Sequence, residues 1–408
     1  MLRRMQQRLH HLDALRAAAM LLGIVLHASL AYTGGPWMVR DEGHWTFAVA
    51  NFAIHGFRMP LFFLLSGFFT ALLWKRHGIG GMLRNRAARI ALPLAIALFT
   101  IVPLIWIVAI VAGAEQGGED APPAGDGAAP PRPLALMVWL ALRFPLFGHL
   151  WFLWYLCWLV LGFALVAWCA KRTTLAARLG RLTRPSAATR LFLSSAGALV
   201  WLVPITVVSV ACMDWTRAEP GFGPDTSAAL VPMPGILLHY AIFFAAGALF
   251  HEIPDALDGF SRRWIVAAVA ALAIFPIATS FAYGAPWTRA LMPSAPFHSV
   301  LAWTGQALYA WLMCIACIGL FARFASEERP AVRYLADSAY WLYLVHLPLV
   351  VAGQAVLKPL DWPPALKFTV LTAASTVLLL ASYHWCVRRT WIGVLLNGRR
   401  AVRGSSSS

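Results

Sequence analysis

The chain has 408 residues, of which 60% are hydrophobic and only 12% are charged. Because about a quarter of the residues of an ordinary soluble domain are charged, this composition excludes that class of protein. The formal net charge of +16 could suit nucleic-acid binding, but the basic residues lie in short loops between apolar segments and form no basic domain. We therefore assign the charge to membrane topology and expect no nucleic-acid partner.

Apolar segments long enough to cross a lipid bilayer recur along the whole chain. They predict an all-α polytopic membrane protein with about ten transmembrane helices. The expected spans are residues 12–32, 48–74, 89–112, 149–170, 191–212, 235–251, 264–283, 298–322, 337–356 and 366–387. The shorter apolar segment 134–147 carries Arg143 and Pro145. We expect it to lie at the outer face without crossing, and its role stays open.

Charge bias sets the expected orientation. If the N-terminus is cytoplasmic and only these ten spans cross, most of the 33 lysines and arginines lie on the cytoplasmic side. The C-terminus is then cytoplasmic as well. We predict a single transmembrane domain over 1–390 and a flexible cytoplasmic tail over 391–408, which ends in "GSSSS".

The first span, "HLDALRAAAMLLGIVLHASLAY", carries ionisable residues inside an apolar segment. Arg16 and His27 are eleven residues apart, which places them on one helix face with a rise of roughly 16 Å between them. Ionisable groups in a span are costly and commonly functional. The alternatives are an ion pair of Arg16 with Asp13, or snorkelling to the headgroups, and a hydrogen-bonded packing role for His27.

The second span contains "HGFRMPLFFLLSGFF". His55 and Arg58 share a helix face, and because this span runs in the opposite direction they lie near the expected depth of His27. We expect both to converge with His27 in the outer half of the bundle. Arg58 has no carboxylate nearby in the sequence, and Pro60 could kink the helix and open a polar cavity.

Three further places carry candidate residues. Arg86 and Arg89 stand where the third span begins, either as membrane anchors or as a phosphate clamp. His149 and Trp151 lie at the start of the fourth span, where an aromatic belt is the alternative reading. His346 lies inside the ninth span, as a packing residue or in a polar pocket.

These residue types together suit acyl transfer. Histidine has an unperturbed pKa of about 6.5 and can remove a proton near neutrality. An arginine can stabilise a developing oxyanion, and inner-face arginines can bind a phosphorylated donor. The sequence has no G-x-S-x-G motif and no cysteine beside a base. We therefore expect direct transfer without a metal, although acylation of His27 itself stays open.

The sequence also resembles a known family. Arg16 and His27, separated by ten residues, resemble the R-x10-H motif of the membrane-bound acyltransferase 3 family, and Arg86 and Arg89 resemble its R-x-x-R motif. The blocks "HGFRMPLFFLLSGFF", "HLWFLWYL" and "YWLYLVHLPLV" are most similar to its glucan-biosynthesis branch, which transfers succinyl groups.

This resemblance implies an acyltransferase of the bacterial inner membrane, embedded in the lipid bilayer. Acyl-CoA would be its co-substrate, with no bound cofactor, and a periplasmic glucan or other envelope carbohydrate its acceptor. His27 and Arg58 would be catalytic, and Arg16, Arg86 and Arg89 would bind the donor. The pocket would be formed by His55, His149, Trp151 and His346. The acyl group (succinyl or acetyl), the acceptor glycan and the oligomeric state stay open.

Two other functions are compatible with the same residues. A proton-coupled transporter could use the histidines and Arg58 as a relay. A non-catalytic subunit of a glycan export complex could use them for helix packing. The sequence feature against the transporter is the Arg-x-x-Arg motif beside a line of histidines, with no paired carboxylates within the spans.

Overall fold

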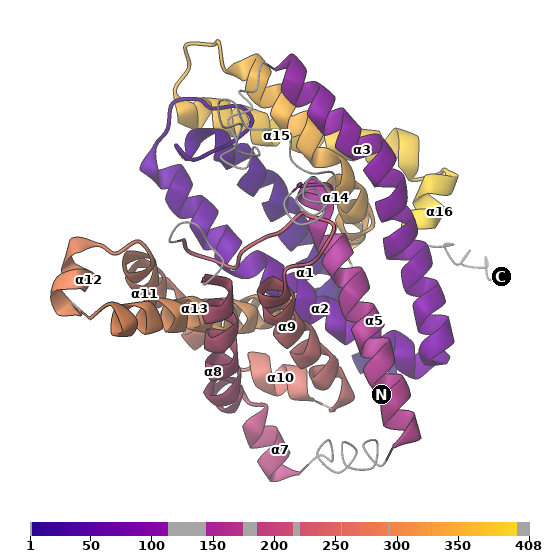
Figure 1. Cartoon of the computed structure of the whole chain (residues 1–408). Coiled ribbons are helices and arrows are strands. Elements are labelled where there is room, and N and C mark those ends of the chain that lie inside the picture. Colours follow the sequence, from indigo (N-terminus) through magenta and orange to yellow (C-terminus); the bar gives the residue numbers. More distant parts are fainter. Residues whose placement is uncertain are drawn as a thin grey trace, which may run out of the picture.

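The computed structural model describes residues 2–112, 144–173, 186–214, 221–253, 255–292, 294–327 and 329–397. Within these ranges the regular elements are all helical (Figure 1). The α-helices are α1 (Leu2–Ser29), α2 (Trp45–Arg86), α3 (Leu92–Val111), α5 (Trp151–Arg172), α7 (Ala187–Phe192), α8 (Ser195–Asp214), α9 (Pro234–Glu252), α10 (Ala256–Ser261), α11 (Trp264–Ala282), α12 (Pro286–Leu291), α13 (Ala295–Phe324), α14 (Pro330–Leu357), α15 (Pro364–Ser382) and α16 (Trp391–Asn397). Short 3-10 turns cover Leu30–Tyr32 and Gly148–Leu150, and π-helical turns cover Ala87–Ala91 and Tyr383–Val387.

In the described part of the chain, nine helical segments are long and apolar enough to cross a membrane. One of them, Trp45–Val111, has 67 residues, which at 1.5 Å per residue is about 100 Å and far exceeds a hydrocarbon core of about 30 Å. Gly78 divides it, because its φ of 67° interrupts the helix. The nine segments therefore cover all ten predicted spans, and the chain is a multi-pass membrane protein.

Two predictions concern segments next to these spans. Most of the segment 134–147 lies outside the described residues. Residues 391–397, which the sequence assigned to a flexible tail, instead form α16, in which Gly393 and Leu396 are buried. The described part of the expected tail is thus packed against the bundle.

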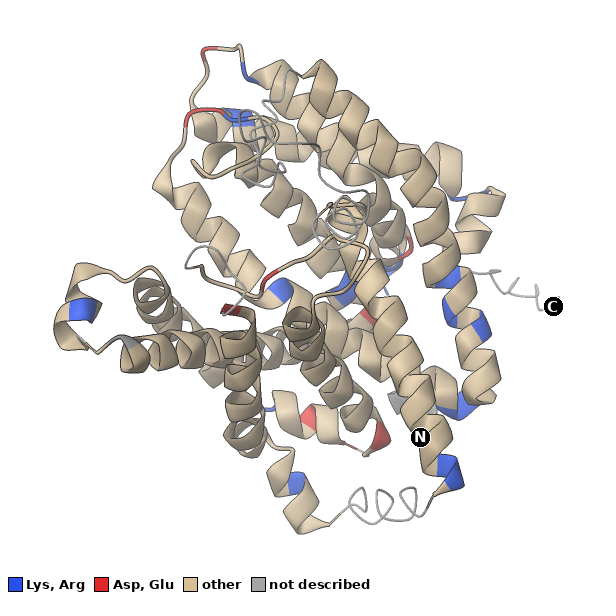
Figure 2. Ribbon diagram, in the orientation of Figure 1, with Lys and Arg blue, Asp and Glu red and all other residues tan. Residues whose placement is uncertain are grey.

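Basic residues mark the ends of several helices. Arg84 and Arg86 occupy the last turn of α2, and Lys171 and Arg172 the last turn of α5. Figure 2 shows blue ribbon at the lower end of α5, on α7, and on the helical stretch that leads into α3. Such clusters at helix ends are typical of membrane proteins, whose cytoplasmic loops are enriched in lysine and arginine.

Helix α1 lies inside the bundle and positions the site. It contacts α2, α13, α14 and α15 (Figure 1). Helix α2 also packs on α5 and α9, while α14 packs on α3 and α15. Side chains that point from α1 toward α2 and α14 are therefore enclosed by protein, which is where ionisable groups can be kept out of lipid.

Close approach of α2 and α9 depends on two glycines. A Cβ added at Gly67 would overlap the carbonyl oxygen of Phe244, and one added at Gly247 would overlap that of Leu64. Small residues allow membrane helices to approach in this way. Since α2 carries Arg58, this contact fixes the helix that brings the guanidinium to the site.

We predict that Gly247→Ala destabilises the protein by about 1–3 kcal/mol, because α2 and α9 must separate to admit the methyl group. The matched control is Gly162→Ala in α5, where an added Cβ meets nothing within 4 Å. That substitution should be neutral or stabilising by about 0.5–1 kcal/mol, since alanine is the better helix former. Thermal unfolding of the two purified variants measures both effects. Equal midpoints for Gly247→Ala and wild type would contradict the close contact.

Candidate active site

Three histidines from distant parts of the sequence meet inside the bundle. The ring centroids of His27 in α1 and His346 in α14 are 5.1 Å apart, and those of His346 and His149 are 5.2 Å apart. His149 and His346 are buried, at 8% and 2% exposure. We call these three side chains the imidazole cluster. The structure therefore brings together three of the histidines that the sequence selected.

Backbone hydrogen bonds fix the protonation of two of these rings. His346 Nδ1 lies 2.8 Å from the carbonyl oxygen of Tyr343, and His149 Nε2 lies 3.1 Å from that of Leu344. Because a carbonyl oxygen only accepts, each of these nitrogens carries the proton. In the neutral rings, His346 Nε2 and His149 Nδ1 are then hydrogen-bond acceptors. Both are buried and have no partner among the described residues, as is His27 Nδ1.

The Arg58 guanidinium lies beside α1. A Cβ added at Gly23, one helical turn before His27, would overlap Arg58 Nη1. Arg58 acts electrostatically on all three rings of the imidazole cluster. Its Nε is buried without a hydrogen-bond partner among the described residues, and no ion pair of Arg58 with a described carboxylate is present. The guanidinium therefore lies inside the bundle without a carboxylate partner among the described residues.

The other two pocket candidates, His55 and Trp151, have different neighbours. The Cδ2 of His55 is next to the place where a Cβ on Gly223 would lie, so His55 faces the loop before α9. Trp151 is buried in an aromatic group, with ring centroids 5.4 Å from Tyr240 and 5.6 Å from Tyr155. The Trp151 ring, on the helix that follows His149, therefore lies within the apolar core.

Sequence reasoning missed two residues at the imidazole cluster. The Trp37 ring stacks on His27, with centroids 5.8 Å apart and an interplanar angle of 26°. Gln354 of α14 accepts a hydrogen bond from Trp37 Nε1 at 2.9 Å and donates one to the backbone oxygen of His27 at 3.0 Å. The available signal for Gln354 was a polar residue inside an apolar span, eight residues after His346 and therefore on a similar helix face.

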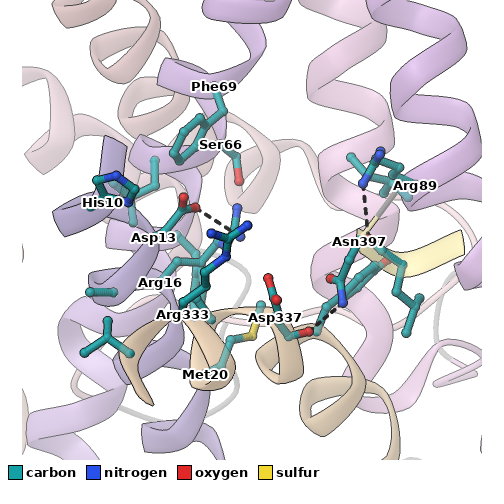
Figure 3. Close-up of a pocket in the computed structure, with 18 of the residues that line it drawn as sticks. His10, Asp13, Arg16, Met20, Ser66, Phe69, Arg89, Arg333, Asp337 and Asn397 are labelled. Atoms are coloured by element: carbon teal, nitrogen blue, oxygen red, sulfur yellow. Dashed lines mark hydrogen bonds and ion pairs between the residues drawn. The ribbon is translucent and has the colours of Figure 1, made fainter. Parts of the chain in front are cut away.

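The expected donor-binding arginines share one cavity. It has a volume of about 490 Å³, and Arg16, Arg86 and Arg89 all line it. In Figure 3 the side chains of Arg16 and Arg333 lie close together next to Asp13, with Arg89 and Asn397 across the cavity. We call this space the arginine cavity. It joins residues from α1, α2, α14, α16 and the π-helical turn before α3.

Each expected arginine is held differently. Arg16 Nη2 pairs with Asp13 at 3.2 Å, and both side chains are 41% exposed, so the ion pair expected as an alternative coexists with a place in the cavity wall. Arg86 Nη2 donates to Thr70 Oγ1 at 2.9 Å. Arg89 Nη1 donates to the Leu396 carbonyl oxygen at 3.4 Å (Figure 3). Of these three contacts, only that of Arg16 is with a carboxylate. The arginine cavity therefore holds all three guanidinium groups in place without neutralising all of their charges.

The far wall of the arginine cavity includes residues that the sequence did not select. Arg333 and Asp337 come from the first turns of α14, and Asn397 comes from α16. Asn397 Nδ2 donates to the Asp337 carbonyl oxygen at 2.8 Å, which fastens α16 to α14 (Figure 3). Arg333 stands in an ordinary basic loop, Asp337 at the first residue of a predicted span and Asn397 in the expected tail, positions where polar residues are common.

Aromatic side chains separate the arginine cavity from the imidazole cluster. Phe62 follows Arg58 by one turn of α2, Phe152 follows His149 by three residues, and both line the cavity. The Phe152 ring lies 6.1 Å from that of Tyr343, whose hydroxyl donates to the His149 carbonyl oxygen at 2.9 Å. Phe152 and Tyr343 thus connect the wall of the arginine cavity to the imidazole cluster.

Comparison with known proteins decides the class. A family model described as an acyltransferase domain, of the acyltransferase 3 type, matches residues 9–384. The chain belongs to the acyltransferase 3 family. The match contains the imidazole cluster, Arg58 and the three expected arginines, and it ends before α16. Family membership assigns acyl transfer as the class of reaction and confirms the resemblance seen in the sequence.

Curated relatives also match most of the chain. They include the glucans biosynthesis protein C of Salmonella schwarzengrund (strain CVM19633), of Salmonella typhi and of Salmonella typhimurium. Each is 26% identical to this chain over 357 residues, which cover 86% of the chain and 84% of the relative. No solved structure matches the chain significantly.

Proposed function

We propose that this acyltransferase 3 family member moves an acyl group from acyl-CoA to a hydroxyl of a periplasmic or other envelope glycan, in the bacterial inner membrane. The observation that carries the proposal is the pairing of the arginine cavity with the imidazole cluster, which Phe152 and Tyr343 connect. The glycan acceptor is supported by the name of the relatives, which are glucans biosynthesis proteins. The family membership supports acyl transfer itself.

The arginine cavity suits the charged end of coenzyme A. Guanidinium groups bind phosphate oxygens with two parallel hydrogen bonds, which favours arginine over lysine at such sites. Arg16, Arg86 and Arg89 surround one space of about 490 Å³. The thioester end would then extend past Phe62 and Phe152 toward His27. Along α1, Arg16 and His27 are eleven residues apart, a rise of roughly 16 Å, so an extended donor is required to reach both.

In the proposed reaction, His27 takes the proton of the acceptor hydroxyl as its oxygen attacks the thioester carbonyl carbon. Arg58 stabilises the negative charge on the tetrahedral oxygen. When the carbon–sulfur bond breaks, the coenzyme A thiolate leaves and takes the proton from the His27 imidazolium. An ester and free coenzyme A result, and the protein returns to its starting state. In the alternative reaction, His27 is acylated first and then passes the acyl group to the glycan. A search for acylated protein distinguishes the two reactions.

The proposal and its rivals are separated by reconstitution. The purified protein in lipid vesicles would be supplied with labelled succinyl-CoA or acetyl-CoA on one side and glucan oligosaccharides on the other. We expect ester-linked label on the oligosaccharide with one of the two donors. Oligosaccharide that crosses the vesicle unmodified would favour the proton-coupled transporter. Neither transfer nor transport by the isolated protein would favour a non-catalytic export subunit.

A prediction for donor binding concerns Arg86. We expect Arg86→Gln to raise the donor KM by about 10–100-fold, because a hydrogen bond to a charged group contributes about 1.5–3 kcal/mol. The matched control is Arg84→Gln, which removes an exposed arginine two residues away that does not line the cavity. Initial rates at varied acyl-CoA concentration measure both variants. Equal donor KM values for the two variants would remove Arg86 from the donor site.

A further inference from the structure

Helix α1 ends at the imidazole cluster. Its last residue is Ser29, and a 3-10 turn over Leu30–Tyr32 follows. The carbonyl groups of a final helical turn lack regular partners within the helix, and burial makes an unsatisfied carbonyl costly. His27 lies in this turn. The position of its side chain therefore depends on how the end of α1 is completed.

Gln354 of α14 donates hydrogen bonds to the carbonyl groups at the end of α1. Its side-chain Nε2 donates to the His27 carbonyl oxygen at 3.0 Å and to the Ala28 carbonyl oxygen at 3.4 Å. Gln354 is 1% exposed and lies in the last turn of α14, where an unpaired buried amide would be costly. The amide nitrogen is thus directed at the backbone of the turn that carries His27.

The acceptor end of the same amide holds Trp37. Gln354 Oε1 accepts from Trp37 Nε1 at 2.9 Å, and the Trp37 ring stacks on the His27 ring at 5.8 Å between centroids. Trp37 also packs against the small apolar cluster of Val39, Ile105, Leu347 and Val351, which limits its movement. One side chain therefore connects the backbone of His27 to the aromatic ring that covers its imidazole.

Helix α14 contacts His27 at two levels. His346 lies beside the imidazole, with ring centroids 5.1 Å apart, while Gln354, two turns further along α14, binds the backbone. This arrangement follows from the geometry of α1. The His27 side chain tilts toward the N-terminus of α1, where it meets His346, while the His27 carbonyl group points toward the C-terminus, where it meets Gln354. Two residues of one helix therefore contact the side chain and the backbone of His27.

We propose that Gln354 is a positioning residue for acyl transfer, which holds His27 and Trp37 in the orientation needed for proton removal from the acceptor. The inference rests on the proposed function of His27 as the base. Gln354 binds neither substrate: it acts through His27 and lies outside the arginine cavity. Its loss should therefore lower kcat while leaving the donor site unchanged.

The test compares Gln354→Met, Trp37→Phe and the double variant in the reconstituted transfer assay. Methionine keeps the length of the side chain and removes its hydrogen bonds. We expect Gln354→Met to lower kcat by about 10–100-fold, since a displacement of about 1 Å at a reacting group can cost about 100-fold. The donor KM and the calorimetric Kd of coenzyme A should stay within about twofold of wild type.

Trp37→Phe keeps a stacking ring and removes the indole donor, so we expect a smaller loss of kcat. The double variant should be no worse than Gln354→Met alone, because that substitution already breaks the Trp37 hydrogen bond. The matched control is Trp341→Phe, which removes an indole hydrogen bond to Ser382 of 3.0 Å elsewhere on α14. It should leave kcat unchanged.

An unchanged kcat in Gln354→Met would overturn the inference while leaving the proposed function standing. A loss of kcat accompanied by an equal loss of coenzyme A affinity and a lower unfolding midpoint would also overturn it, because that result describes a general structural role. If the wild-type protein transfers no acyl group, the proposed function and this inference fail together.

Discussion

Substitution of His27 by alanine is expected to reduce kcat for acyl transfer by about 10²–10⁴-fold, the usual contribution of a positioned general acid–base group. His27 is the cluster member that faces both His346 and Trp37. The other two rings donate through one nitrogen to backbone carbonyl groups, whereas His27 Nδ1 is buried without a partner among the described residues. Removal of this ring takes away the proposed base and leaves the arginine cavity intact.

The control for His27→Ala is His384→Ala, which removes an exposed histidine in the π-helical turn after α15. Both variants should bind coenzyme A as the wild type does. A search for acylated protein after rapid acid quenching separates a base from a covalent carrier, because only the carrier retains label on His27. If His27→Ala transferred acyl groups at the wild-type rate, the imidazole cluster would become a structural feature and the transporter and export-subunit functions would gain support.

The spans and the main site residues could be predicted because the bilayer imposes a simple rule on the sequence. Ten apolar segments of sufficient length were visible, and ionisable residues inside them stood out by their cost. His27, Arg58 and His346 were selected in this way, and the structure places them together. The R-x10-H spacing also placed Arg16 and His27 on one face of a continuous α1.

The contributions of Gln354, Trp37 and α16 could not be predicted in the same way. Gln354 acts through hydrogen bonds to the backbone of a helix 326 or more residues away in sequence, and no local pattern reports such a contact. Trp37 lies in a loop, where a tryptophan near a membrane surface has a simpler explanation. Helix α16 is short and follows the last span, so its packing onto α14 through Asn397 depends on tertiary contacts alone.

Arg58 offers the second large effect. Arg58→Ala is expected to lower kcat by about 10²–10³-fold, comparable to the loss of one oxyanion-stabilising donor in other acyl-transfer enzymes. Arg58→Lys should recover little of this loss, because a compact ammonium cannot reproduce the planar donor fork of guanidinium. The donor KM should change little in either variant, since the phosphate-binding arginines lie in the arginine cavity and Arg58 does not line it. Steady-state kinetics with varied donor and acceptor measure these effects.

The structure offers an independent way to move this guanidinium without mutating it. Gly23 lies against Arg58 Nη1, and an alanine Cβ there would overlap that atom. Gly23→Ala should therefore displace the Arg58 side chain and reproduce part of the loss in kcat, while Gly162→Ala, in open space on α5, should have no such effect. If Arg58→Ala lowered kcat but Gly23→Ala did not, the charge of Arg58 would matter and its position against α1 would not. If neither lowered kcat, the oxyanion would have to be stabilised by another group.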